Sequence, residues 1–362
     1  MTEQQPGGRQ VLPVVAAPAQ RPGSEPSPQP AGEPTRGSSA QTSASIGRVK
    51  TGRRGDAAFA ALTTGSSIFI IAIVAFVAVF LLWRAVPSLR QNHASFLFSR
   101  VWSPDTIPPS FGIAGLFYTT VLIAAWALVL AVPVSVGLAL FMTQVVRRGV
   151  GTVLARLVDL LAAVPSIIYG LWGVTNLAPL LLPVGTAISG FMDNWWFTRW
   201  FPLTRPGIAD SGTVFAAGIV LSIMILPIIT SISREVFATT PIPTKEGALA
   251  LGATRWEMIR LTVLPYGRSG LVSGAMLGLG RALGETIAVM IILSASFGGS
   301  AFNPSLFAGG ETFASKIAAS ASEFNAPTQT GAYIAAGLVL FVITFVVNAI
   351  ARFVVERGRR GE

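Results

Sequence analysis

The sequence predicts an all-α, polytopic membrane protein with about six transmembrane helices, and three observations support this fold class. The chain of 362 residues is 52% hydrophobic and only 12% charged, whereas soluble domains contain about 25% charged residues. Six largely apolar runs are each long enough for the ~20 residues that a spanning helix needs. None of these runs alternates apolar and polar residues as a membrane barrel does. Helices are therefore expected, because only helices and closed barrels satisfy the backbone within lipid.

The first 56 residues have a different composition. They are rich in Pro, Gly, Ser, Gln and Ala and contain no aromatic residue. Such a segment cannot bury enough apolar surface to offset the entropy lost on folding, so residues 1–56 are predicted to be a disordered tail. The tail ends in a basic cluster made of Arg48, Lys50, Arg53 and Arg54. Clusters of this kind usually lie on the cytoplasmic side of a first span.

Residues 57–355 form the predicted transmembrane domain, and residues 356–362 form a short cytoplasmic tail. The six apolar runs are 57–83, 113–142, a stretch within 160–192, 211–233, 269 to about 293, and a stretch within 324–351. The second, third and fourth runs contain Pro133, Pro165 and Pro227. These prolines predict kinks or breaks, which membrane helices tolerate when neighbours satisfy the freed carbonyls.

The placement of the cations predicts the orientation of the chain. Most of the 26 Lys and Arg residues fall in four segments: the N-terminal tail, the loop after the second run, the loop after the fourth run and the carboxyl end. Cytoplasmic segments carry an excess of Lys and Arg. Both termini and these two loops are therefore expected in the cytoplasm.

Several kinds of chemistry are absent from the sequence. The chain has no Cys and a single His, His93, so a tight His/Cys metal site is not expected. It also lacks the G-x-x-x-x-G-K-[ST] loop, so it cannot bind ATP by that route. We expect no catalytic residue, no metal and no cofactor on this chain, and therefore no enzymatic activity of its own.

The loop between the fourth and fifth runs, residues 234–268, contains a charged stretch, EGALALGATRWEMIRLTVLP. Its charges keep it out of the hydrocarbon, and they are Glu246, Arg255, Glu257 and Arg260. The stretch is expected to be a short helix that ends at Leu264-Pro265, because proline lacks an N–H and clashes with the preceding turn. Gly252 removes a side chain and would let another surface approach the backbone. We predict that a partner grips this segment at the membrane surface.

The fifth run carries two charges within apolar surroundings, GLGRALGETIAVM. Arg281 and Glu285 are four residues apart, so on a helix they would share one face and could pair. Each charge costs about 2.5–3.5 kcal/mol near the bilayer centre, and such residues usually face a bundle interior or a water-filled path. An Arg in a path suits an oxyanion, because its fork matches phosphate geometry. The alternative is an internal ion pair that only fixes the helix register.

The charged stretch after the fourth run resembles the EAA loop of ABC-importer permeases. Five positions match at the family's spacing, and Gly247 replaces the first Ala; the matching residues are Glu246, Ala248, Gly252, Leu264 and Pro265. In this family the loop is a coupling helix that docks into a groove on the ATPase subunit. The resemblance implies the architecture of a type I ABC-importer permease.

Two further segments narrow this resemblance to phosphate ABC permeases, more the PstC type than the PstA type. GLGRALGETIAVM is similar to the family's fifth-span signature, and AVPSIIYGLWG, which contains Pro165, Ser166, Tyr169 and Gly170, is similar to its third-span signature. The resemblance implies a substrate path at Arg281, Glu285 and Thr286. It also implies a plasma-membrane importer of phosphate that contains a second permease of PstA type, two PstB-type ATPase subunits that bind ATP and Mg, and an extracytoplasmic PstS-type binding protein.

Three other functions compete with this one. A permease for sulfate or molybdate would share the EAA loop but lacks the context of the RALGET segment. An ion-coupled secondary anion transporter would need internal repeats, and it would leave the EAA spacing unexplained. A membrane scaffold without transport activity would not need Arg281 and Glu285 in hydrocarbon.

Overall fold

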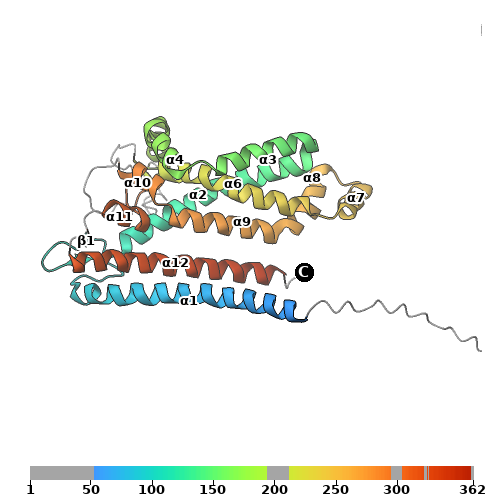
Figure 1. Cartoon of the computed structure of the whole chain (residues 1–362). Helices are drawn as coiled ribbons and strands as arrows, with labels where there is room; N and C mark the ends of the chain where they lie inside the picture. Colours follow the sequence, from blue (N-terminus) through green and yellow to red (C-terminus); the bar gives the residue numbers. More distant parts are fainter. Residues whose placement is uncertain (1–52, 194–211, 295–303, 322–323, 325, 360–362) are drawn as a thin grey trace, which may run out of the picture. The chain divides into compact units, whose positions relative to one another are not determined.

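The computed structural model describes residues 53–193, 212–294, 304–321, 324 and 326–359, and these residues are almost entirely helical (Figure 1). By internal contacts the chain divides into two units, residues 1–62 and 63–362. Residues 1–52 lie outside the described part, so the predicted disorder of the tail stays a prediction. Helix α1 (Arg53–Gln91) includes the last four residues of the predicted tail, 53–56. Asp56 lies in the first turn of α1, where a negative charge favours the helix start.

The described residues contain five helices long and apolar enough to cross a membrane, and six if one bent pair is counted as a span. This confirms the predicted fold class. The five are α1, α2 (Ala114–Leu140) with its π-helical end η1 (Phe141–Val145), the run through α4 (Ser166–Trp172), η2 (Gly173–Leu177) and α5 (Ala178–Asp193), α6 (Val214–Ala238), and α12 (Pro327–Arg359). The bent pair consists of residues 255–284, which end in α9 (Leu264–Gly284), and α10 (Ile287–Ser294).

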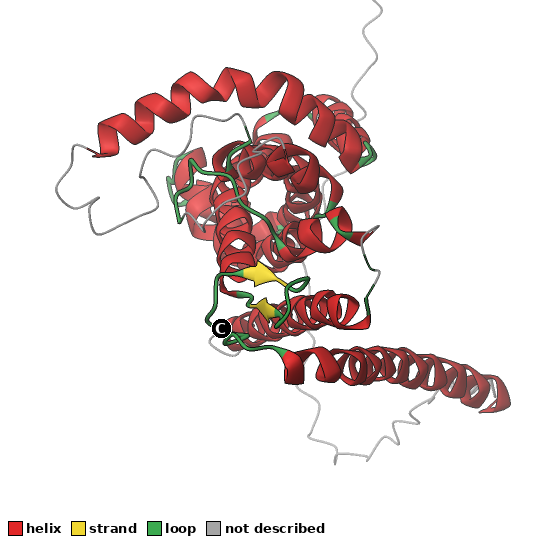
Figure 2. Ribbon diagram, turned by 90° about the vertical axis from the view of Figure 1, so that its left-hand side faces the viewer, coloured by secondary structure: helices red, strands yellow, loops and turns green. Residues whose placement is uncertain are grey.

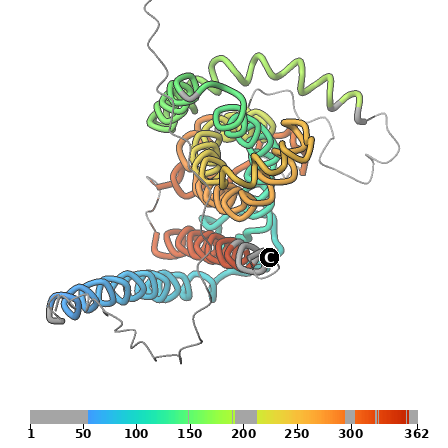
Figure 3. Tube along the Cα trace, turned by 90° about the vertical axis from the view of Figure 1, so that its right-hand side faces the viewer, coloured from blue at the N-terminus to red at the C-terminus, as the bar shows by residue number. Residues whose placement is uncertain are grey.

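The third apolar run is divided into pieces. Helix α3 (Arg148–Ala162) ends before Pro165, and α4 begins directly after it, so the predicted break at this proline is confirmed. By contrast, Pro133 and Pro227 lie inside α2 and α6 without interrupting them. Beyond η2, α5 runs across the direction of the other helices, as the lime segment of Figure 3 shows.

Helix α6 lies at the centre of the second unit, packed against α2 and α9. Small residues let these helices approach closely. Gly218 of α6 lies beneath the ring of Trp126, and Gly278 of α9 lies against Ile229. The buried side chains around α6 are mostly aliphatic, including Ile225, Ile229 and Leu221. These side chains form the main hydrophobic cluster of the unit.

The two ends of the bundle carry different structures. One end bears a small hairpin, β1 (Trp102–Ser103) paired antiparallel with β2 (Ser110–Phe111) (Figure 2). It also bears α11 (Phe313–Ala319). The other end bears α7 (Ile242–Ala250), α8 (Arg255–Met258) and the π-helical turn η5 (Ile259–Val263), which leads into α9 (Figure 1). The EAA-like stretch and the hairpin therefore lie at opposite ends.

Candidate functional site

The fifth span is broken where its two charges lie. Helix α9 ends at Gly284, Glu285 adopts an extended backbone with φ −68° and ψ 124°, and α10 begins at Ile287 after a bend of 56°. Arg281 and Glu285 therefore do not share the face of one continuous helix, and that expectation is wrong. The i, i+4 relation holds only while the helix continues.

Glu285 has a local role that its spacing from Arg281 did not predict. Its side chain is only 8% exposed, and its Oε1 accepts a hydrogen bond of 3.4 Å from the backbone N–H of Ala288. The carboxylate thus lies at the start of α10, where the helix dipole favours a negative charge. Among the described residues no ion pair joins Glu285 to Arg281, so the predicted pair is not formed here.

Arg281 and Thr286 lie on either side of the break. The Arg281 side chain is exposed on the last turn of α9. Thr286 donates its hydroxyl to the carbonyl of Gly284 at 3.1 Å, which is one of the acceptors left free where α9 ends. The guanidinium is therefore open to an anion or to a partner chain.

The residues of the third-span signature pack against α10, the helix that follows the break. Pro165 stands immediately before α4 and Ser166 opens it. Tyr169 is buried and donates its hydroxyl to the carbonyl of Leu161 at 2.9 Å. Gly170 lies against α10, and a Cβ at this position would come within 2.9 Å of the Cα of Ala288. Two segments more than a hundred residues apart in the sequence thus meet at the break.

Replacing Gly170 with Ala should weaken this contact. The added Cβ would collide with backbone, which cannot rotate away, so α4 and α10 must separate; overpacking of this kind costs about 1–3 kcal/mol. We expect a lower melting temperature of the purified protein and reduced transport. Gly137→Ala is the matched control, because nothing lies within 4 Å of a Cβ there. Equal melting temperatures for the two variants would contradict the contact.

The EAA-like stretch forms two helices joined by a turn, so the expectation of one short helix is wrong. Helix α7 ends at Ala250, and Gly252 has a φ of +88°. The N–H of Gly252 bonds to Leu249 O, and the N–H of Ala253 bonds to Ala248 O. These two bonds form a Schellman motif with glycine in the left-handed position. No atom lies within 4 Å of a Cβ at Gly252, so within this chain the glycine serves the turn and not a close packing contact.

Helix α8 starts with a capping box. The Thr254 hydroxyl accepts from the N–H of Glu257 at 3.3 Å, and the N–H of Thr254 donates to Glu257 Oε2 at 2.8 Å. This T-x-x-E pattern was present in the sequence and indicates a new helix start. This pattern was not used in predicting the helix. Together, the capping box and Gly252 mark the point where the EAA-like stretch divides into α7 and α8.

Pro265 does not end a helix, contrary to expectation. The chain passes from η5 into α9 at Leu264, so Pro265 lies in the first turn of α9. Residues 255–284 are helical without a gap, so Pro265 lies directly after a helical turn and not at a free helix start. The π-helical turn η5 just before it has a different hydrogen-bond spacing, which accommodates the N–H that proline lacks. The motif's Leu-Pro therefore begins the fifth span.

The turn between α7 and α8 presents apolar side chains that sequence analysis missed. Leu251 is 91% exposed and Trp256 is 61% exposed, and Glu246 and Gly247 are exposed on α7. Ala248 instead packs on a buried cluster under the turn. In the sequence, a Trp within a charged loop was the indication that this loop exposes apolar surface. We call residues 242–258 the coupling turn.

Comparison with known proteins decides the family. The model of the family described as binding-protein-dependent transport system inner membrane component matches residues 131–360. The chain belongs to this family. It is a multi-pass membrane protein and a transport permease subunit, not an enzyme.

Relatives of this permease carry more specific names. It is 53% identical over 308 residues to the phosphate transport system permease protein PstC 2 of Mycobacterium tuberculosis, covering 84% of this chain and 93% of the relative. It is 37% identical over 334 residues to the phosphate transport system permease protein PstC of Xylella fastidiosa, covering 89% and 97%. A chain of the MetNI methionine ABC transporter, in an inward-facing structure, has 17% identity, a TM-score of 0.45, and coverage of 68% of this chain and 95% of its own.

Proposed function

We propose that this permease is the PstC-type subunit of an ATP-driven phosphate importer. The observation that carries the proposal is its similarity to PstC proteins over more than nine-tenths of their length. The meeting of the third-span and fifth-span signatures at one break supports it, because this is where a membrane protein can place polar groups away from lipid.

The break between α9 and α10 is the proposed substrate path. Arg281 supplies an exposed guanidinium, which recognises a phosphate through charge-assisted hydrogen bonds. Glu285 fixes the start of α10 by accepting from Ala288. Thr286 holds the end of α9 through Gly284.

The coupling turn is the proposed contact with the ATPase. It is exposed, has an apolar tip, and has a shape fixed by the Schellman motif and the capping box. In this scheme ATP and Mg bind to two PstB-type subunits, and closure of that pair pulls the coupling turn. The η5 turn transmits the pull directly into α9 and so to the break.

The remaining parts of the complex are proposed on the same basis. A PstA-type permease would complete the path, and a PstS-type binding protein would deliver phosphate from outside. We propose that both termini and the coupling turn lie in the cytoplasm of a plasma-membrane protein, an orientation that the cation bias of the sequence favours. The hairpin and α11 then face outward, since they lie at the opposite end (Figure 1).

Phosphate uptake by cells that carry the whole complex tests the proposal, with sulfate uptake as the comparison. The complex with the unmodified chain should take up phosphate and not sulfate. Arg281→Gln should lower phosphate uptake at least about tenfold, since charged hydrogen bonds contribute about 1.5–3 kcal/mol. Arg84→Gln, which removes an exposed Arg from α1, is the matched control and should keep uptake near normal. Undiminished uptake with Arg281→Gln would remove the role of this residue.

A further inference from the structure

The break before α4 leaves one backbone carbonyl without its usual donor. In a continuous helix the N–H of residue 165 would bond to the carbonyl of Leu161, but Pro165 has no N–H. The N–H of Val164 lies 3.4 Å from Leu161 O, which is longer than the usual N–H···O distance of about 2.9–3.0 Å. Because lipid offers no donor, this carbonyl needs a donor from another group of the chain.

The hydroxyl of Tyr169 takes the place of the missing donor. It donates to Leu161 O at 2.9 Å, and the residue is only 9% exposed. Leu161 lies in the last turn of α3 and Tyr169 lies in α4, so this one bond spans the break at Pro165. A tyrosine ring has few rotatable bonds and loses little entropy when it is held in place. The bond therefore constrains where α4 lies relative to the end of α3.

Helix α4 and the turn η2 that follows it pack closely on α10. Gly170 is the residue next to Tyr169, and a Cβ built on it would come within 2.9 Å of the Cα of Ala288. Three residues later, a Cβ on Gly173 would come within 3.0 Å of the Ile292 side chain. Neither glycine has a side chain that could turn aside, so a displacement of α4 is passed on to α10.

Ala288 connects this contact to the break in the fifth span. It is 1% exposed, it lies against Gly170, and its N–H donates to Glu285 Oε1. Glu285 is the extended residue that follows α9. The position of α4 thus bears on the backbone at residues 284–286, and Arg281 lies on the turn of α9 just before them.

We propose that Tyr169 is a positioning residue for the phosphate path at Arg281, an inference that rests on the proposed function. The Tyr169 hydroxyl holds α4 in place across the Pro165 break. Through the contact between Gly170 and Ala288, α4 holds the start of α10 and the bend between α9 and α10. This bend sets the direction in which Arg281 presents its guanidinium. Because the hydroxyl is already bonded to the backbone, Tyr169 acts through α10 and not on phosphate itself.

Tyr169→Phe tests this role, because it removes the hydroxyl and keeps the buried ring. In cells that carry the whole complex, phosphate uptake should fall about three- to tenfold, within the range for the loss of one neutral hydrogen bond. The melting temperature of the purified complex should fall by only about 2–4 °C.

Tyr118→Phe is the matched control. Tyr118 of α2 also donates its hydroxyl to a backbone carbonyl, that of Pro304, at 2.7 Å, but neither residue belongs to the break in the third or the fifth span. The two variants lose the same kind of bond, so their melting temperatures should fall by similar amounts. Only Tyr169→Phe should lower phosphate uptake.

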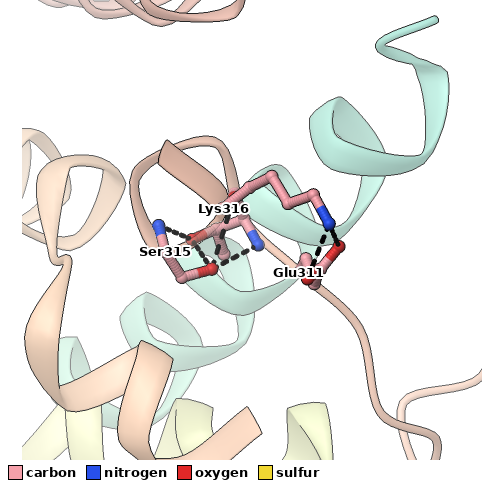
Figure 4. A network of polar contacts seen from close by, with 4 residues as sticks. Glu311, Ser315 and Lys316 are labelled. Atoms are coloured by element: carbon pink, nitrogen blue, oxygen red, sulfur yellow. Dashed lines mark hydrogen bonds and ion pairs between the residues drawn. The ribbon is translucent and has the colours of Figure 1, made fainter. Parts of the chain in front are cut away.

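The segment that accepts the Tyr118 bond has other attachments. Residues 304–319 also accept from the N–H of Val214 at the start of α6. Within the segment, Lys316 and Glu311 form an ion pair of 2.9 Å beside the capping box that starts α11 (Figure 4). We therefore expect the control variant to keep this segment in place and phosphate uptake near normal.

The same change in an Arg281→Gln background separates positioning from stability. If Tyr169 acts through the Arg281 site, the two residues are coupled, and Tyr169→Phe should lower the residual uptake of Arg281→Gln by less than about twofold. A hydroxyl that only stabilised the fold would instead repeat the full loss of about three- to tenfold, because independent effects multiply.

Two results would overturn the positioning role. One is equal uptake by Tyr169→Phe and Tyr118→Phe, and the other is the full loss repeated in the Arg281→Gln background. Both would leave phosphate import by the unmodified complex intact. If the unmodified complex took up no phosphate, the proposed function would fail, and the role of Tyr169 with it.

Discussion

Replacing Gly252 with Ala should lower phosphate uptake about tenfold, because the coupling turn needs a left-handed backbone at this position. Gly252 has a φ of +88°, and L-residues pay about 1–2 kcal/mol to adopt this region. A destabilisation of about 1.4 kcal/mol corresponds to a tenfold lower rate. No neighbour lies within 4 Å of a Cβ at Gly252, so the cost is conformational and not steric. The Schellman bonds of Gly252 and Ala253 would be weakened, and α7 would leave its fixed angle to α8.

Two further variants separate this cause from others. Gly252→Asn should lose less activity than Gly252→Ala, because Asn visits the left-handed region more readily. Gly149→Ala is the matched control, since Gly149 lies in helix α3 with nothing within 4 Å of a Cβ and no positive φ. The measurements are phosphate uptake and co-purification of the ATPase with the permease. Equal behaviour of Gly252→Ala and Gly149→Ala would show that the turn geometry is not required.

Removing the Glu285 carboxylate should have the second large effect. In Glu285→Ala the N–H of Ala288 loses its acceptor, and losing a side-chain cap costs about 0.5–2 kcal/mol. The start of α10 would then fray at the break that forms the proposed substrate path. We expect a lower melting temperature and phosphate uptake reduced about two- to thirtyfold, by the same conversion of energy to rate.

Glu285→Gln distinguishes the cap from the charge. Its amide oxygen can still accept from Ala288, so the melting temperature should stay near that of the unmodified protein. Uptake should fall by a smaller factor than in Glu285→Ala, because the break keeps its shape and only the charge is lost. Asp105→Ala removes an exposed carboxylate from the hairpin and is the matched control. Our account of Glu285 would fail if the Gln variant were as unstable as the Ala variant.

The sequence predicted the membrane architecture well, because hydrophobicity alone specifies it. Apolar runs of sufficient length must be helical in lipid, and the described residues contain five such helices and one bent pair. The EAA spacing and the two span signatures also placed the family, which the match over residues 131–360 confirms. Pro165 was a reliable break because it follows a helix end, whereas Pro133 and Pro227 are accommodated within packed helices.

The errors concern places where a helix stops. Arg281 and Glu285 have helical spacing, and Leu279 and Ile287 around them are apolar, so no residue pattern indicated the bend of 56°. Glu285 lies outside α9 and accepts a hydrogen bond at the start of α10, where Ala288 also packs against Gly170 of α4. The division at Gly252 was in principle readable, because glycine followed by T-x-x-E is a helix end and a helix start.

The amino-acid sequence by itself determined which segments are long and apolar enough to cross a membrane, the family of the chain, and which residues carry charge in the fifth span. These features depend on composition and spacing, which each segment expresses locally. Only the tertiary structure decided that Tyr169 and Gly170 meet the Arg281–Glu285 break, and that residues 304–319 cover the start of α6. Contacts of this kind join segments far apart in the chain, and their energy comes from packing and hydrogen bonds that exist only after the helices have assembled.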